Sequence, residues 1–163
     1  MKNIYSLFTV IMLTLSTTTN AQIVRAEIRA TGLTCSMCSN AINKQLKSLP
    51  DVVDVTIDLN TNTFTVTLKE GNDLTPKIFK EKVEKAGFFI GSLVLTAKSN
   101  TLTQGSYIVV NDAKSNAAEI QFQVLDKGYV TEKEFKKLSK TYKNWETYAA
   151  NNEDDFHIKI MKS

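Results

Sequence analysis

Hydrophobic and polar residues alternate along three short stretches in the first part of the chain. These stretches cover residues 24–30, 53–59 and 64–68. A period of two predicts a strand that buries one face and exposes the other. Residues 60–62 are turn-like, so the second and third strands are expected to pair as a hairpin. A more continuously apolar stretch at residues 88–95 predicts a fourth strand.

Two intervening segments have helical spacing instead. Their hydrophobic residues recur at intervals of three and four positions, which places the side chains on one face of a helix. These residues are Ile42, Leu46 and Leu49 in the first segment and Phe79, Val83 and Ala86 in the second. Pro50 ends the first predicted helix. Thr75 and Pro76 are typical of a helix start, and Gly87 is typical of a helix end.

The predicted elements over residues 23–95 follow the order strand, helix, strand, strand, helix, strand. This is the order of the split-βαβ, ferredoxin-like arrangement. The expected fold class is therefore α+β, a sandwich of a four-stranded antiparallel sheet with two helices on one of its faces. We assign residues 22–96 to this first domain.

A second unit is predicted after a polar linker at residues 97–106. Residues 107–163 form a small α+β unit to which the sequence assigns no function. Strands are expected near residues 107–110, 120–124 and 156–160, and Thr131 with Glu134 matches a helix capping box. The stripe that follows predicts one helix whose aromatic residues pack into a core; it consists of Phe135, Leu138, Tyr142, Trp145 and Ala149.

The N-terminal segment has the pattern of a secretory signal peptide. Lys2 is followed by a mostly apolar run at residues 4–15 and then by a small, polar stretch that ends at Ala21. The apolar run is shorter than the roughly 20 residues of a membrane-spanning helix. We expect residues 1–21 to be a signal peptide cleaved after Ala21. The mature protein is then periplasmic or otherwise exported, with no membrane span; an uncleaved anchor is the alternative.

The composition excludes several function classes. A net charge of +3 over 163 residues gives no basic stripe of the kind that binds nucleic acid. One histidine and two cysteines exclude a self-contained zinc site of four cysteines, or of two cysteines and two histidines. Serine, histidine and carboxylate residues show no catalytic spacing, so we do not expect an enzyme.

The two cysteines carry the most specific signal. Cys35 and Cys38 lie between the first predicted strand and the first predicted helix, and their spacing allows both sulfurs to converge on one ion. Cys38 falls in the first helical turn, where unpaired N–H groups and the helix dipole favour thiolate. Two thiolates suit a soft ion of low coordination number. Cu(I) is the expected ion, and Hg(II), Ag(I) and Cd(II) are also plausible. Zn(II) would need two molecules to share it, so the protein is expected to be a monomer or a metal-bridged dimer.

Residues 23–95 resemble the heavy-metal-associated domain family, which includes small copper chaperones, periplasmic mercury-binding proteins and the metal-binding modules of P-type ATPases. The family string Gly-Met-Thr-Cys-x-x-Cys is matched from Gly32 to Cys38, with Leu33 in place of the inward-facing methionine. The resemblance implies that Cys35 and Cys38 are the metal ligands. It also implies that Gly87 and Phe88 lie beside the metal loop and shield it. A partner protein could then take the ion by adding its own thiols.

Other interpretations remain open for the same residues. The cysteine pair could serve a thiol–disulfide redox module or form an inert disulfide. The domain could also be kept for its fold in an envelope interaction protein. Met37 is expected to contact a partner, with metal ligation as the alternative. His157 is expected to be an edge histidine, and the alternative is a second copper site with Met161.

Overall fold

The computed structural model describes residues 22–34, 36–99, 102, 106–111, 113, 117–150, 152 and 155–161. The predicted signal peptide at residues 1–21 lies outside these residues. Within the described part of the chain, the helices are all too short or too polar to cross a lipid bilayer.

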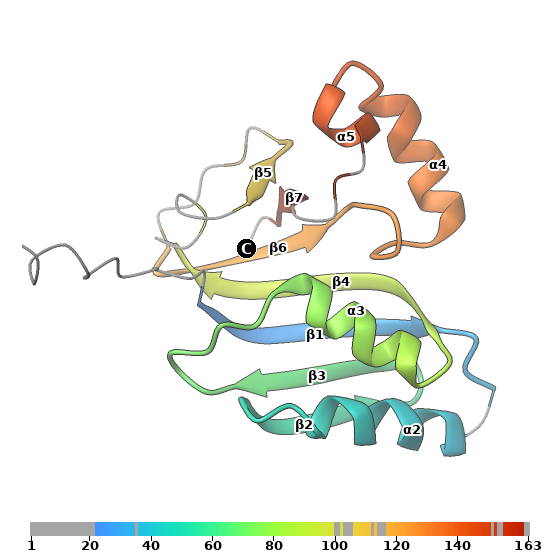
Figure 1. Cartoon of the computed structure of the whole chain (residues 1–163). Helices are drawn as coiled ribbons and strands as arrows, with labels where there is room; N and C mark the ends of the chain where they lie inside the picture. The colour runs from blue at the N-terminus through green and yellow to red at the C-terminus, as the bar shows by residue number, and fades with distance from the viewer. Residues whose placement is uncertain are drawn as a thin grey trace, which may run out of the picture.

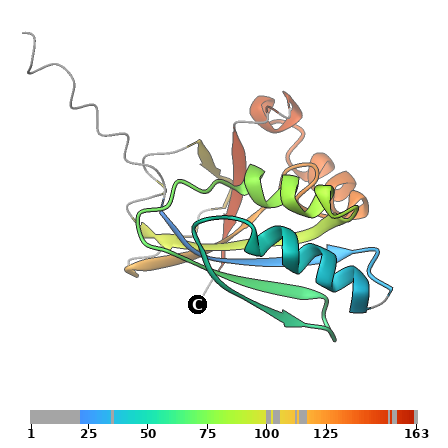
Figure 2. The ribbon, with the colours of Figure 1, turned by 60° about the horizontal axis from the view of Figure 1, so that its bottom comes forward.

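The first six elements follow the order expected from the sequence. They are β1 (Ile23–Thr31), α2 (Ser36–Lys47), β2 (Val52–Asp58), β3 (Thr63–Leu68), α3 (Pro76–Lys85) and β4 (Phe89–Lys98). The strands pair antiparallel in the order β2-β3-β1-β4. Helices α2 and α3 lie on the same face of this sheet (Figures 1 and 2). The ferredoxin-like α+β prediction is confirmed.

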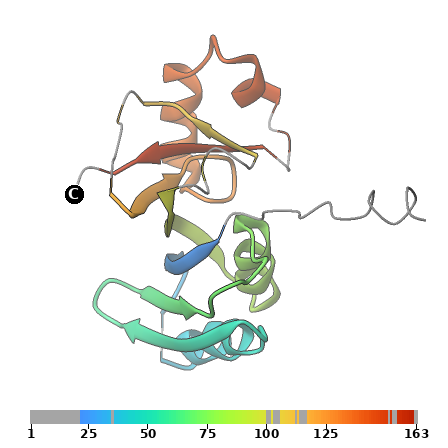
Figure 3. The same ribbon diagram turned by 90° about the vertical axis from the view of Figure 1, so that its left-hand side faces the viewer.

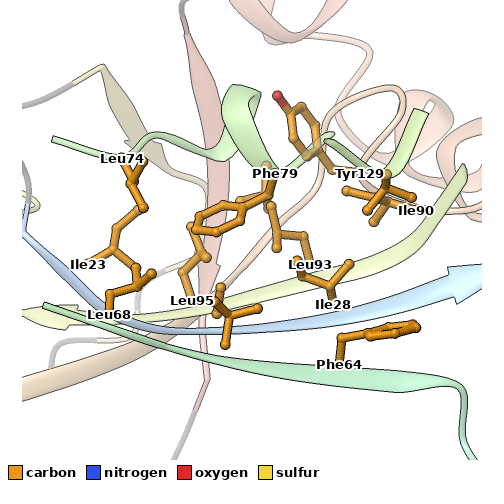
Figure 4. Packing of buried hydrophobic residues seen from close by; sticks show 14 of the residues in the cluster. Ile23, Ile28, Phe64, Leu68, Leu74, Phe79, Ile90, Leu93, Leu95 and Tyr129 are labelled. Atoms are coloured by element: carbon orange, nitrogen blue, oxygen red, sulfur yellow. The ribbon is translucent and has the colours of Figure 1, made fainter. Parts of the chain in front are cut away.

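The core lies between this sheet and its helices, as the alternating pattern requires. Ile28 of β1 is paired with Phe64 of β3 on one side and Leu93 of β4 on the other, and all three are fully buried. Phe79 of α3 packs into the same cluster (Figure 4). Burying one side chain of this size stabilises the fold by about 1.5–3 kcal/mol. The cross-strand register therefore holds β1 firmly up to its end at Thr31.

The C-terminal segment extends the same sheet. It contains β5 (Tyr107–Val109), β6 (Glu119–Val124), α4 (Glu132–Thr141), α5 (Glu146–Ala150) and β7 (Phe156–Ile160). Strand β6 pairs antiparallel with β4, β7 pairs with β6, and β5 lies parallel to β7. The described strands thus form one seven-stranded sheet in the order β2-β3-β1-β4-β6-β7-β5 (Figure 3).

This pairing joins the two predicted units. Strand β4 continues to Lys98, past the predicted domain end at residue 96, and Tyr129 of the C-terminal segment belongs to the common core (Figure 4). Several residues of the predicted linker at 97–106 lie outside the described part. The boundaries of the predicted units stay predictions.

The single helix predicted for residues 135–149 is wrong. Helix α4 ends at Thr141, and a turn in which the Trp145 N–H donates to the Tyr142 carbonyl separates it from α5. Aromatic contacts span the break between the two helices, since the Tyr142 ring contacts the rings of Trp145 and Tyr148. The hydrophobic pattern therefore resembles that of one continuous helix. Trp145 is 37% exposed, so it is not the core residue that the stripe predicted.

Candidate functional site: the loop between β1 and α2

The loop that carries the cysteines begins with a glycine in a left-handed conformation. Gly32 follows the last residue of β1 and has a φ of 83°. Residues with a Cβ rarely adopt this conformation, whereas glycine adopts it without strain. A Cβ at Gly32 would lie 3.9 Å from Cδ1 of Phe88, which is ordinary van der Waals contact. Backbone conformation, rather than lack of space, therefore requires glycine here.

Cys38 lies in the first turn of α2 and is half-buried. The first turn contains no acidic residue, and Lys44 and Lys47 lie in the last turn. The partial positive charge at the helix N-terminus is thus not offset by a carboxylate in that turn, which favours the thiolate form of Cys38. Cys35, the other predicted ligand, lies outside the described residues, so its pairing with Cys38 stays a prediction.

Phe88 reaches the loop because of the way α3 ends. Gly87 has a φ of 87°, its N–H donates to the Glu84 carbonyl at 2.8 Å, and the Phe88 N–H donates to the Val83 carbonyl at 3.2 Å. These are the two hydrogen bonds of a Schellman motif, whose left-handed residue is usually glycine. The motif turns the chain so that the Phe88 ring meets Gly32. Phe88 therefore lies beside the loop, as predicted, and its shielding of a bound metal stays a prediction.

Hydrophobic side chains around the loop face in two directions. Leu33 is half-buried and packs against the core, as expected of the residue that replaces the family methionine. Met37 is 79% exposed, and Phe89 at the start of β4 is 69% exposed. An exposed side chain at position 37 fits a partner contact, while ligation by Met37 stays untested.

His157 is not the edge histidine that the sequence predicted. Its strand, β7, lies between β6 and β5, and its side chain is fully buried. Nδ1 lies 2.7 Å from Oδ1 of Asp126, and Nε2 lies 3.0 Å from Oγ1 of Thr147. Both ring nitrogens thus have protein partners, and Met161 is 41% exposed beyond the end of β7. This arrangement does not support a copper site made of His157 and Met161.

Sequence analysis missed Asp126, the partner of His157. Burial raises the pKa of its carboxyl group, and hydrogen bonds from the His157 side chain and backbone oppose that rise. The residue opens an Asp-Lys-Gly turn, and 31 positions separate it from His157. A local pattern identifies the turn but contains no information about the distant histidine.

Residues 27–89 match the family model of the heavy-metal-associated domain. The chain therefore contains a heavy-metal-associated domain at these residues. The match covers the loop with both cysteines, helices α2 and α3, and the Gly87-Phe88 pair.

The relatives that this chain matches are much longer proteins. A copper-transporting ATPase of Saccharomyces cerevisiae is 44% identical over 57 residues, which are 35% of this chain and 6% of the relative. A copper-exporting P-type ATPase of Staphylococcus haemolyticus is 45% identical over 47 residues, which are 29% of this chain and 6% of the relative. The chain thus spans only a small part of the length of either ATPase.

Solved structures also match part of this chain. The yeast copper transporter domain Ccc2a, studied in apo and Cu(I)-loaded states, is 38% identical with a TM-score of 0.36; the match covers 43% of this chain and 92% of that domain. The CopZ metallochaperone is 17% identical with a TM-score of 0.37, and the match covers 40% of this chain and 97% of that protein.

Proposed function

We propose that this chain, whose residues 27–89 form a heavy-metal-associated domain, is an exported protein that binds Cu(I) between Cys35 and Cys38 and passes it to a partner. The observation that carries the proposal is the placement of Cys38. It lies in the first turn of α2, directly after a loop that begins at the left-handed Gly32 beside Phe88. The family match covers this loop, and the resemblance to the family supports soft-metal binding there.

The chemistry follows from the ligand type. Thiolate sulfur is a soft ligand that selects Cu(I) among common metal ions, and Hg(II), Ag(I) and Cd(II) are chemically similar cargoes. Two thiolates leave room for a third ligand. A thiolate from a partner can therefore join the ion before either cysteine leaves, so the ion moves by ligand exchange without becoming free in solution.

Copper is the proposed cargo because both ATPase relatives are described as copper transporters. Export is supported by the sequence pattern of residues 1–21 alone. The mass of the mature protein recovered from its native cell would test export. Loss of residues 1–21 is expected, and a full-length protein in the cytoplasm would contradict the proposed localisation.

The central experiment is an anaerobic Cu(I) titration of the reduced protein against a chromogenic competitor. The Cys35→Ser/Cys38→Ser variant should lose tight binding of about one ion per chain or per dimer. Met37→Leu is the matched control, because it changes an exposed sulfur between the two cysteines and leaves both thiolates in place. Equal, weak binding by the wild-type protein and the double-serine variant would reject the proposal. The reduction potential of the cysteine pair would then test the redox alternative.

A further inference from the structure

Thr31, the last residue of β1, is half-buried at the base of the metal loop and has close neighbours in β4. Its Oγ1 donates a hydrogen bond to the carbonyl oxygen of Phe89 at 3.2 Å. Its methyl group Cγ2 faces Gly91 so closely that a Cβ at position 91 would lie 2.6 Å from it. Such a distance is a steric clash, so glycine at position 91 is what allows Thr31 its position.

Gly91 is also the extra residue of a β-bulge. Arg29 is paired with Ser92 and Ala30 is paired with Ile90, so the register between β1 and β4 shifts at Gly91. A bulge bends its strand and changes the direction of the residues beside it. This bulge lies opposite the end of β1, where the chain leaves the sheet and enters the metal loop.

The C-terminal segment reaches the same point. Val130 forms an isolated bridge with Ser92, the residue after Gly91. Cγ2 of Thr131 would lie 3.6 Å from a Cβ at Gly91, so the methyl groups of Thr31 and Thr131 both lie where a side chain at position 91 would point. Thr131 is itself held in place, because its hydroxyl accepts the Glu134 N–H at the start of α4. Thr31, Phe89 and Thr131 also line one groove of about 1070 Å³ between α3 and α4.

We infer that Thr31 is a positioning residue for the metal loop, and that Gly91 and the C-terminal segment hold it in place. Thr31 directly precedes Gly32, so its orientation sets the direction in which the chain enters the turn that leads to Cys38. Residues outside the ligand set that fix ligand orientation commonly change metal affinity by 10- to 100-fold when they are mutated. The inference rests on the proposed Cu(I) binding. It gives residues 117–131 a role in that binding.

A steric clash and its relief test this inference in the full-length protein. Gly91→Ala should weaken Cu(I) affinity by about tenfold, because the new methyl group displaces Thr31. Adding Thr31→Ser removes Cγ2 and keeps the hydroxyl. The other atoms near the new methyl group, the Arg29 carbonyl oxygen and Thr131 Cγ2, lie at 3.5 and 3.6 Å, which is ordinary contact. The double variant should therefore bind Cu(I) within about twofold of the wild-type protein.

A second pair of variants applies if Gly91→Ala fails to fold, as judged by circular dichroism. Thr31→Val keeps the shape of the side chain but removes its hydrogen bond to Phe89, and it should weaken Cu(I) affinity by several-fold. Thr67→Val is the matched control, since Thr67 is an exposed strand residue near the opposite end of β1, paired with Arg25. It should leave affinity unchanged.

The outcomes separate the inference from the proposed function. Absence of tight Cu(I) binding in the wild-type protein would reject the function. Tight wild-type binding that neither Gly91→Ala nor Thr31→Val alters would reject the positioning role alone. A folded Gly91→Ala/Thr31→Ser variant that binds as poorly as Gly91→Ala would also reject it.

Discussion

His157 and Asp126 form a buried pair that joins β7 to the end of β6. Both carboxyl oxygens of Asp126 lie against the same residue: Oδ2 accepts the backbone N–H of His157 at 2.6 Å, and Oδ1 lies 2.7 Å from Nδ1 of its ring. His157 is fully buried and Asp126 is 7% exposed. The pair fixes the outer strands of the sheet, and its removal should leave a polar group buried without its partner.

Asp126→Asn should therefore destabilise the protein by about 3 kcal/mol, the usual result of removing one member of a buried pair. An asparagine amide has a single acceptor oxygen, so it cannot replace both carboxyl oxygens that Asp126 presents to His157. Urea denaturation followed by circular dichroism measures the effect. Asp54→Asn is the control, because Asp54 is exposed and its ion pair with Lys47 is at the surface with an N···O distance of 4.0 Å. A loss no larger than that of the control would show that the pair is unimportant for stability.

The Asp58 carboxylate makes a pH-dependent contribution to the free energy of unfolding, and the direction of its pKa shift gives the sign. Its carboxylate accepts from Thr61 Oγ1 at 2.8 Å and from the Asn60 N–H at 2.9 Å, and these bonds lower its pKa below 3.8. A carboxyl group whose pKa is lower in the folded state than in the unfolded state stabilises the folded state at a pH above the unfolded-state pKa. This stabilisation is lost as the pH falls through the folded-state pKa. Asp58→Asn should thus be less stable than the wild type at neutral pH, and the difference should shrink below about pH 3.8. A difference that stays constant down to acid pH would contradict this assignment.

Comparing Gly87→Ala with Gly71→Ala should separate two effects of a substituted glycine. One is backbone strain, which lowers stability, and the other is displacement of Phe88 beside the metal loop. Nothing lies within 4 Å of a Cβ at Gly87 or at Gly71, and both residues have positive φ, 87° and 75°. Each alanine should destabilise the fold by about 1 kcal/mol. Only Gly87→Ala should also weaken Cu(I) binding, because Gly87 sets the position of Phe88 beside Gly32. Thermal melting and the Cu(I) titration measure the two effects. Equal Cu(I) affinity in both variants would show that the position of Phe88 does not affect Cu(I) binding.

Cu(I) affinity should fall as the solution becomes more acidic, because protons compete with the metal for the two thiolates. Competitive titrations between about pH 8 and pH 5 test this expectation. In the Cys35→Ser/Cys38→Ser variant, the remaining weak binding should lack this thiolate dependence. An affinity of the wild-type protein that does not change over the range would exclude thiolate ligation.

Local signals predicted more of the first domain than of the second. Alternation in β1 and β3 and helical spacing in α2 and α3 reflect contacts with one common core, so each element could be recognised within its own window. In the C-terminal segment, the spacing from Phe135 to Trp145 looked like one helix, because aromatic contacts bridge a turn. The sequence does contain a local signal at Gly91, because an isolated glycine within an apolar strand favours a β-bulge or a close approach of another segment.

The sequence alone determined the ferredoxin-like order of elements, the cysteine pair at the start of α2 and the glycine-phenylalanine end of α3. Each depends on residues close together in the chain, whose spacing sets backbone conformation directly. Only the tertiary structure decided that β6 pairs with β4, that Asp126 meets His157, and that the methyl groups of Thr31 and Thr131 both approach Gly91. These contacts join residues tens of positions apart. They arise from strand register and close packing, which the pattern of a single segment does not encode.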